Sequence, residues 1–396
     1  LFNPTVEIDW DIVSRFDRRN QAQNSNIEDY YYGEQMQAAR AGQGAEKARR
    51  IEEAGPGYSY KTRAFADAFG EVRGIAHFEM TFDGLTDIGT KTPEELGVPR
   101  WQGTPEENAK LLNTAARIFG ASYMGYAELD SRYRNKLVCS HTTGKTARFV
   151  YGDVEKGYAA TDPTGEMKQK WVIPNHDMYS ILIGAPESLM GMKTAPSLIS
   201  KANMYGTINV DRAYVGIANF IHTLGYQLTG QLGHQTMPLN AGAAAVLMGV
   251  AEQSRQNLYV LTPDSGPRIN HENVLTDLPL APTPPIDAGM WKFCRTCGIC
   301  ADNCPGGWIS KSRELSYEPD DANGKSTANM THALGPKALW LDAAGCRMQF
   351  KLWGGTCHTC YAFCPFNEGR DAMIHNTVKM TIANIGLFNG FFAHQG

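Results

Sequence analysis

Eight of the nine cysteines follow residue 293, and their spacing is typical of iron–sulfur ligation. The first run has the pattern C-x2-C-x2-C-x3-C-P, with which bacterial ferredoxins hold [4Fe–4S] clusters. Its members are Cys294, Cys297, Cys300 and Cys304, with a proline next. The second run also ends in a proline but is stretched, with ten residues between its first two cysteines. Its members are Cys346, Cys357, Cys360 and Cys364.

In ferredoxins with two clusters, the fourth cysteine of each run ligates the other cluster. This rule assigns one cluster to Cys294, Cys297, Cys300 and Cys364. It assigns the other to Cys346, Cys357, Cys360 and Cys304. Zinc is the alternative, because C-x2-C pairs also bind zinc, but two C-x3-C-P endings in one module disfavour it. Cys139 lies outside both runs, and we interpret it as a buried structural thiol.

More than 290 residues precede the first run, far more than an electron carrier needs. We therefore expect this part of the chain to hold an electron acceptor. No G-x-G-x-x-G follows a predicted strand and no P-loop lysine motif is present, so nucleotide fingerprints are lacking. The run D-x-H-x-x-G, which supplies a histidine to the cobalt of cobalamin, is also missing. No histidines pair as in H-E-x-x-H, so we expect them to be structural.

Three helical patterns, each followed by a short strand pattern, precede the cysteines. Thr104, Pro105 and Glu107 predict the start of a helix over 105–119, which Gly120 ends, and a strand follows at 121–129. A second helix is predicted over 211–224 with Asp211 as its cap. A third is predicted over 241–256 and leads into a strand at 257–263 and a turn at 263–268. Alternating helices and strands predict an α/β or α+β core over 105–270.

The remaining segments divide the chain into four parts. Residues 1–100 read as a polar, loop-rich segment wrapping the core, and the arginine pair in 14–20 as surface. Residues 101–285 form the main domain and 286–380 the cysteine domain, joined by a stiff proline-rich connector at 278–289. A polar insertion at 316–332 interrupts the cysteine domain. Residues 381–396 form an apolar tail that we expect to pack back on the body.

Composition excludes several classes of protein. The formal net charge of -4 gives no electrostatic case for nucleic acid as a partner. The longest apolar run, 241–251, has eleven residues, fewer than the roughly 18 that span a bilayer. The chain begins with Leu1 and the arginine pair lacks a following apolar stretch, so we expect a processed or truncated form without its export signal.

The order of several segments resembles the respiratory reductive dehalogenases, which are corrinoid iron–sulfur enzymes. The segments are "YVGIANFIHTLGYQ", "MPLNAGAAAVLMGVAEQSR", "LYVLTPDSGPRI", "LTDLPLAPTPPIDAG", "FCRTCGICADNCP" and "FKLWGGTCHTCYAFCPFNEG". The resemblance covers residues 105–380. It implies an α+β fold, with a nitroreductase-like corrinoid-binding domain and a C-terminal ferredoxin-like domain with two [4Fe–4S] clusters. It also implies base-off cobalamin, which agrees with the missing D-x-H-x-x-G.

The resemblance further implies the residues of the active site. Tyr214 matches the family's proton donor, Arg268 the arginine that assists it, and Asn240 an asparagine of the substrate pocket. We expect Arg268 to lie beside Tyr214 and to lower its pKa. The corrinoid contacts are expected at Pro238, Leu239, Gly242, Ala243 and Trp353. From the residues alone, Tyr214 reads as a core aromatic, Trp353 equally as core filler, Arg268 as a turn-closing surface residue, and Asn240 as a helix cap.

The implied reaction is two-electron reductive removal of halide from a small chlorinated alkane or alkene in organohalide respiration. The implied partners are a small integral-membrane anchor protein, an upstream respiratory electron donor and a second copy of the chain in a homodimer, without nucleic acid. The implied location is the outer face of the cytoplasmic membrane, after export of the folded chain by the twin-arginine route. Two alternatives remain: a cobalamin-dependent epoxyqueuosine reductase acting on tRNA, and an electron-transfer subunit without a catalytic site.

Overall fold

The computed structural model describes residues 3–75, 79–202, 205–317 and 334–368, with positions 377, 380, 381 and 385. Most of the expected apolar tail and most of the polar insertion lie outside these residues. The described residues comprise the main body and the segments that carry the eight clustered cysteines.

A four-stranded antiparallel sheet forms the centre of the body, in the order β3–β7–β9–β8. The strands are β3 (Tyr123–Glu128), β7 (Tyr179–Pro186), β9 (Ile269–Thr276) and β8 (Leu228–Thr229). Successive side chains of a strand point to opposite faces, and here both faces are covered. Ile181 and Ile183 pack in one apolar cluster, and Leu182 between them packs in another.

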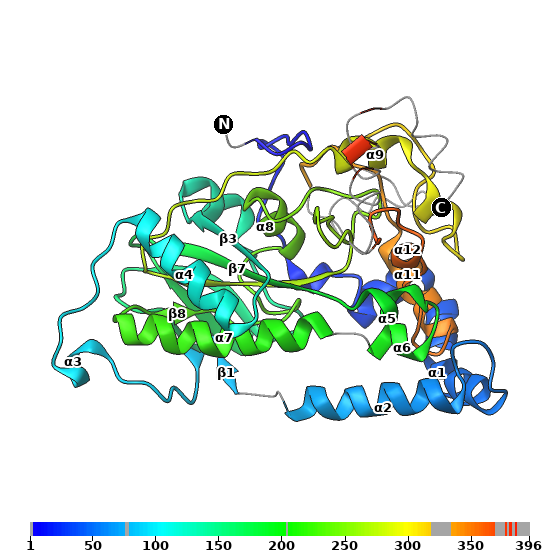
Figure 1. The fold of residues 1–396 in the computed structure, drawn as a ribbon, viewed down its shortest axis with the longest axis horizontal. Helices are drawn as coiled ribbons and strands as arrows, with labels where there is room; N and C mark the ends of the chain where they lie inside the picture. The colour runs from blue at the N-terminus through cyan, green and yellow to red at the C-terminus, as the bar shows by residue number, and fades with distance from the viewer. Residues whose placement is uncertain are drawn as a thin grey trace.

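Helices α4 (Pro105–Phe119) and α7 (Tyr205–Leu224) cover one face of this sheet (Figure 1). The predicted capping box of α4 is present, because the Thr104 hydroxyl accepts from the Glu107 N–H and the Glu107 carboxylate accepts from the Thr104 N–H. The predicted start of α7 at Asp211 is wrong. The helix begins earlier, where the Glu187 carboxylate accepts from the Gly206 N–H at 3.0 Å. Glu187 therefore accepts from a free N–H in the first turn of α7, which is the capping role predicted for Asp211.

The opposite face of the sheet packs against α8 (Ala241–Leu247) and a three-stranded sheet. That sheet has the order β4–β6–β5, formed by β4 (Ala147–Gly152), β6 (Gln169–Pro174) and β5 (Tyr158–Thr161). The helix expected to continue through residue 256 stops at Leu247, and the strand expected over 257–263 does not form. Gly249 has φ 69°, and its backbone lies against the Pro284 carbonyl, so the chain turns away there.

The N-terminal segment is more ordered than expected. The prediction of a loop-rich 1–100 is wrong over α1 (Ser25–Glu52) and α2 (Tyr60–Ile75). Helix α1 packs against α11 (Ala343–Leu352), and α2 packs against α6 (Leu198–Ala202) (Figure 1). Gly33 interrupts α1 with φ 48° and ψ -124°, which marks a kink. Glycine permits the backbone angles of that kink. Because glycines weaken an isolated helix, the packing of α1 against α11 stabilises it.

Short elements complete the body and the cysteine domain. The body contains β1 (Met80–Thr81), β2 (Gly84–Leu85), α3 (Pro93–Leu96) and α5 (Leu189–Lys193). The cysteine domain contains α9 (Met290–Thr296), α10 (Ile299–Asp302), α11 and α12 (Thr359–Ala362). The connector 278–289 has no helix or strand, as its prolines predict. In Figure 1, α9, α11 and α12 lie at the end of the molecule opposite α3.

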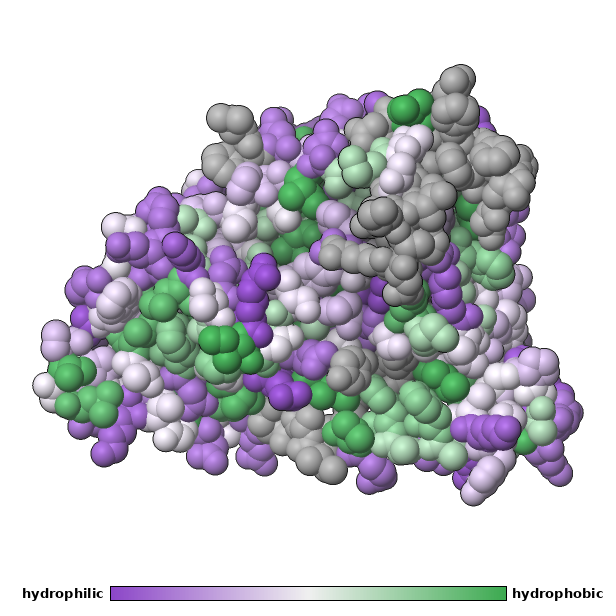
Figure 2. Space-filling view, viewed as in Figure 1, coloured by the Kyte–Doolittle hydropathy of each residue, from purple (hydrophilic) through white to green (hydrophobic). Residues whose placement is uncertain are grey.

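Among the described residues, no helix is both long and apolar enough to cross a bilayer. Hydrophobic and hydrophilic residues are interspersed over the face shown in Figure 2. Several large apolar side chains are nonetheless exposed on helices, among them Tyr60 and Phe65 of α2 and Met190 of α5.

Candidate functional site

The first predicted set of cysteines lines one pocket. Cys294 lies in α9, Cys300 lies in α10, and Cys364 follows α12. All three line the same pocket as Cys297. The apolar residues of that pocket are Leu261, Phe293 and Phe366. Cys364 thus joins the first run, as crossed ligation requires. The pKa of the Cys294 thiol is raised well above its usual value, first by burial and then by neighbouring Cys364.

The second set comes together in the same way. Burial raises the pKa of the Cys346 thiol to about 12, and the next largest contributions come from Cys357 and Cys304. The pKa of Cys360 is raised by burial, then by Cys346 and Cys357. Burial and neighbouring cysteines thus disfavour the thiolates of Cys346 and Cys360, which would form together only with accompanying cations. Cluster iron would supply that positive charge, so the residues fit two iron–sulfur clusters.

The geometry differs from that of a single-ion site. Within the described ranges, no three His, Cys, Asp or Glu side chains converge on one metal position. Zinc needs four ligands about 2.0–2.3 Å from one ion. The cysteines of a [4Fe–4S] cluster surround a larger group and bind different iron atoms, as sulfurs around a common pocket can do.

The segment 252–256 holds both cysteine sets in place. The Glu252 carboxylate accepts from the Met290 N–H at 2.8 Å, at the start of α9. Arg255, 2% exposed, donates to the carbonyls of Cys294 and Arg295, each at 3.0 Å. Gln256 donates to the Cys360 carbonyl at 3.0 Å. These residues were predicted as the end of a helix, so sequence reasoning missed their function.

Tyr214 lies in the apolar cluster between α4, α7 and the sheet, and its side chain is 0% exposed. Burial raises the pKa of its phenol, and burial is the sole cause of the shift. The expected lowering of this pKa by Arg268 is therefore wrong. The phenol keeps its proton at neutral pH and is a weak acid in a dry environment.

Arg268 is buried rather than on the surface, with 7% exposure. Its Nη1 donates to the Glu187 carbonyl at 2.6 Å, and the Glu187 N–H donates to the Arg268 carbonyl at 3.0 Å. Burial lowers the pKa of the guanidinium, while Tyr123 and Glu187 are the first groups that oppose this. The turn expected at 263–268 does form, because the Gly266 and Thr262 backbones pair there.

Asn240 caps α8, since its Oδ1 accepts from the Ala243 N–H at 3.3 Å. The loop before it is held from several sides. Leu239 donates its N–H to Asn273 Oδ1 at 2.9 Å, and the Pro238 carbonyl accepts from the Cys139 N–H at 2.8 Å. Cys139 itself is buried, as predicted. Gly242 follows in the first turn of α8. The expected corrinoid contacts in 238–243 thus lie together, at the end of one loop and in the first turn of α8.

Trp353, the fifth expected cofactor contact, belongs to a different part of the structure from 238–243. It ends α11, its carbonyl accepts from the Tyr58 hydroxyl at 2.9 Å, and the Arg50 guanidinium lies 5.7 Å from its ring. These contacts place Trp353 against the N-terminal helices.

Three buried polar atoms near the start of β9 have no hydrogen-bond partner in the described structure. They are Nε of Arg268, Oδ1 of Asn270 and Nδ1 of His271. His271 reaches the start of α8, with its Nε2 3.1 Å from the Ala241 carbonyl. Buried polar atoms are rarely left unpaired, so the Nδ1 of His271, on the α8 face of the sheet, requires a polar ligand group, whereas Asn270 precedes it in β9 and contacts Thr207 on the α7 face. A corrinoid, whose rim carries amides, fits this requirement.

Comparisons with known proteins bear on the whole chain. A family model described as "Reductive dehalogenase subunit" matches residues 1–280. The chloroethene reductive dehalogenase of Dehalococcoides mccartyi (strain VS) is 27% identical over 458 residues, covering 100% of this chain and 83% of the relative. The trichloroethene reductive dehalogenase of another strain of that species is 29% identical over 343 residues, covering 79% of this chain and 58% of the relative.

A solved structure titled "Reductive dehalogenase structure suggests a mechanism for B12-dependent dehalogenation" matches with a TM-score of 0.59 and 17% identity. It covers 100% of this chain, which spans 47% of that chain, and the likeness concerns the fold. The epoxyqueuosine reductase of Bacillus subtilis (strain 168) is 25% identical over 147 residues, covering 37% of this chain.

Proposed function

The chain belongs to the reductive dehalogenase subunit family, and from that premise we propose that it removes halide reductively from a small organohalide. The reaction is R–X plus two electrons and one proton, giving R–H and halide. The family match over residues 1–280 carries the proposal, together with the two cysteine sets that end the chain. The relatives' names favour a chlorinated ethene or a similar small alkane as substrate.

The proposed cofactors are base-off cobalamin and two [4Fe–4S] clusters. Bound cobalamin would supply the reduced cobalt that engages the carbon–halogen bond. The loop 238–243 would hold the corrinoid, and the unpaired Nδ1 of His271 would accept a hydrogen bond from an amide on its rim. In this proposal the main body is a nitroreductase-like corrinoid domain, and the cysteine domain is ferredoxin-like.

Tyr214 would provide the proton. Its buried phenol remains protonated until a strongly basic carbon develops beside it, which suits a general acid in a dry pocket. Arg268 would hold positive charge near the departing halide or the tyrosinate that remains. Its buried, partly unpaired guanidinium supports this role. Asn240 would align the substrate while it caps α8.

Electrons would enter through the cysteine domain. Cluster one would be bound by Cys294, Cys297, Cys300 and Cys364. Cluster two would be bound by Cys346, Cys357, Cys360 and Cys304. The buried charge of Arg255 lies close enough to Cys297 and Cys300 to favour their thiolates. This charge would stabilise the reduced, more negative state of cluster one.

The proposed setting is organohalide respiration at the outer face of the cytoplasmic membrane. There the chain would sit on a small integral-membrane anchor protein and receive electrons from a respiratory donor, after twin-arginine export. A homodimer is part of the same proposal. This setting follows from the family resemblance and is tested by locating the protein in membrane fractions of its native host.

Halide release decides the main proposal. Protein reconstituted anaerobically with cobalamin, iron and sulfide is given a low-potential donor and chloromethanes, chloroethanes or chloroethenes in turn. We expect chloride release from at least one of them, and none from protein lacking cobalamin. The epoxyqueuosine reductase alternative predicts turnover of a modified tRNA stem loop instead, and the electron-transfer alternative predicts no corrinoid binding.

A further inference from the structure

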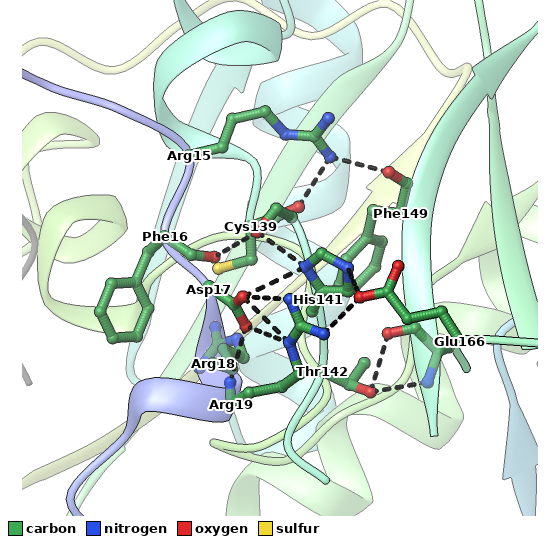
Figure 3. Close-up of polar contacts among 12 residues, drawn as sticks. Arg15, Phe16, Asp17, Arg18, Arg19, Cys139, His141, Thr142, Phe149 and Glu166 are labelled. Atoms are coloured by element: carbon green, nitrogen blue, oxygen red, sulfur yellow. Dashed lines mark hydrogen bonds and ion pairs between the residues drawn. The ribbon is translucent and has the colours of Figure 1, made fainter. Parts of the chain in front are cut away.

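The N-terminal arginine segment, residues 14–20, is built into the body of the protein. The sequence favoured a surface segment, but Arg18 is 1% exposed. Figure 3 shows the segment beside His141 and beside Phe149 of β4. A buried arginine is costly unless its donors are satisfied, so the partners of Arg18 indicate what the segment does.

Arg18 binds the loop that leads to Asn240. Its Nη1 donates to the His234 carbonyl, and its Nη2 donates to the carbonyls of Met237 and Leu239 at 3.1 and 2.8 Å. One planar guanidinium therefore fixes three carbonyls within a short stretch of chain. Charge-assisted bonds of this kind are stronger than neutral ones and constrain geometry as well.

The neighbours of Arg18 hold its own backbone. The Asp17 carboxylate accepts from the Arg19 backbone N–H at 2.9 Å and from the Arg19 guanidinium at 2.6 Å. Arg19 continues to Glu166 at 2.5 Å, and His141 Nδ1 lies 3.5 Å from Asp17 (Figure 3). Arg18 is thus presented to the loop from a fixed position.

The loop has no helix or strand of its own, so hydrogen bonds from neighbouring segments, those of Arg18 among them, fix its conformation. Residues 230–240 contain no helix or strand, and Leu239 makes only an isolated bridge, to Val138. The loop ends at Asn240 and the start of α8, where the proposed corrinoid contacts Pro238, Leu239 and Gly242 are found. If only a fraction of the molecules had this loop in the binding conformation, the apparent Kd would be the intrinsic Kd divided by that fraction.

We propose that Arg18 is a positioning residue for corrinoid binding: it holds the loop 234–240 in the conformation that receives the cofactor. The inference rests on the proposed function, since it takes cobalamin as the ligand of this loop. Arg18 acts through the loop carbonyls and the residues that follow them. Lysine in its place keeps the charge but cannot span three carbonyls with one planar group.

Arg18→Lys tests this inference, with Arg134→Lys as the matched control. Arg134 also donates to three carbonyls, those of Leu129, Pro174 and His176, and none of these belongs to the loop 234–240. Protein with reconstituted clusters is titrated anaerobically with hydroxocobalamin, and binding is followed by quenching of tryptophan fluorescence. If the competent loop population falls to about a tenth, the Kd rises about tenfold in Arg18→Lys. We expect the Kd of Arg134→Lys to equal that of the wild type.

Hydrogen exchange provides a second measurement. Amides of residues 234–243 should exchange faster in Arg18→Lys without corrinoid, and amides of 129–134 should not. Equal Kd values for wild type and Arg18→Lys, with unchanged exchange in the loop, would overturn the inference and leave the proposed function intact. Failure of the wild type to bind hydroxocobalamin would instead overturn the proposed function.

A wild-type experiment keeps the inference testable should Arg18→Lys not fold. Hydroxocobalamin must then slow exchange at both 18–20 and 234–240, because the two segments are joined through Arg18. Protection of the loop without protection of the arginine segment counts against the inference.

Discussion

Glu28 of α1 and Lys351 of α11 form a buried ion pair, with 2.8 Å between Oε1 and Nζ. Their side chains are 2% and 7% exposed. Arg40 and Arg347 also contact the Glu28 carboxylate, at 2.9 and 3.3 Å. Helix α11 carries Cys346 in its first turns, so this pair joins the N-terminal helix to a proposed ligand of cluster two.

Glu28→Gln should destabilise the protein strongly. The change leaves Lys351 buried without its counter-charge, which costs about 3 kcal/mol in comparable buried pairs. Anaerobic urea unfolding of the cluster-loaded protein measures the loss. Glu46→Gln on the same helix is the control, because its pairs with Arg49 and Arg50 are more exposed and should contribute far less to stability. Equal losses in the two variants would contradict this account of α1.

Crossed ligation predicts that single cysteine changes affect the cluster of the other run. Cys304→Ser should disturb the cluster of Cys346, although Cys304 belongs to the first run. Cys364→Ser should disturb the cluster of Cys294. Electron paramagnetic resonance of each dithionite-reduced variant checks the assignment, with Cys139→Ser as a control that should retain both signals. Loss of the same cluster in Cys304→Ser and Cys297→Ser would mean that the ligation is not crossed.

Arg255→Gln should lower the reduction potential of cluster one. The guanidinium charge favours the more negative, reduced state, and glutamine retains hydrogen bonding without that charge. A redox titration followed by paramagnetic resonance should show cluster one shifting to more negative potential while cluster two moves less. An unchanged potential would indicate that Arg255 only braces the backbone carbonyls of Cys294 and Arg295.

Local signals predicted local structure well, and distant contacts account for the errors. Thr104 and Gly120 bound α4 as predicted because capping depends on residues within one turn. The cysteine runs indicated their chemistry because ligand spacing is local too. Arg18 was misjudged because its partners follow more than 200 residues later in the chain, where no pattern links them to it.

The same reasoning explains α1 and α8. Helix α1 contains several glycines and its packing partner α11 is far along the chain, so its sequence alone read as irregular. Helix α8 has a helical pattern beyond Leu247, but the close approach of Pro284 to Gly249 ends it. In both cases tertiary packing outweighed the intrinsic helix propensity.

His271 predicts a pH dependence of stability. Burial lowers the pKa of His271 from 6.5 to about 4, so the folded protein holds this imidazole neutral while the unfolded chain binds a proton. The stability is complete above pH 6.5 and is lost as pH falls toward 4. The loss is about 2 kcal/mol at pH 5.

His271→Gln should remove this part of the pH dependence. Thermal unfolding between pH 7 and pH 5 compares its profile with those of the wild type and of His176→Gln, whose histidine is exposed. We expect His176→Gln to follow the wild type and His271→Gln to fall less steeply. Parallel profiles for all three would show that His271 does not titrate as its burial implies.

Tyr214→Phe should lower turnover about a hundredfold or more while both clusters and cobalamin remain bound, because general acid catalysis contributes on that scale. Phenylalanine fits the apolar cluster around this side chain, so the variant should fold. Tyr126→Phe is the matched control. Tyr126 is equally buried in the same cluster, burial also raises its pKa, and its hydroxyl donates to Asn113 at 3.1 Å.

The two variants separate chemistry from packing. Loss of a buried hydroxyl on either tyrosine affects stability, but only Tyr214 is placed in the proton transfer. Chloride release measured with saturating donor should therefore fall in Tyr214→Phe and stay near the wild-type rate in Tyr126→Phe. If both variants retain activity, the proton reaches carbon by another route and Tyr214 is a core residue of α7.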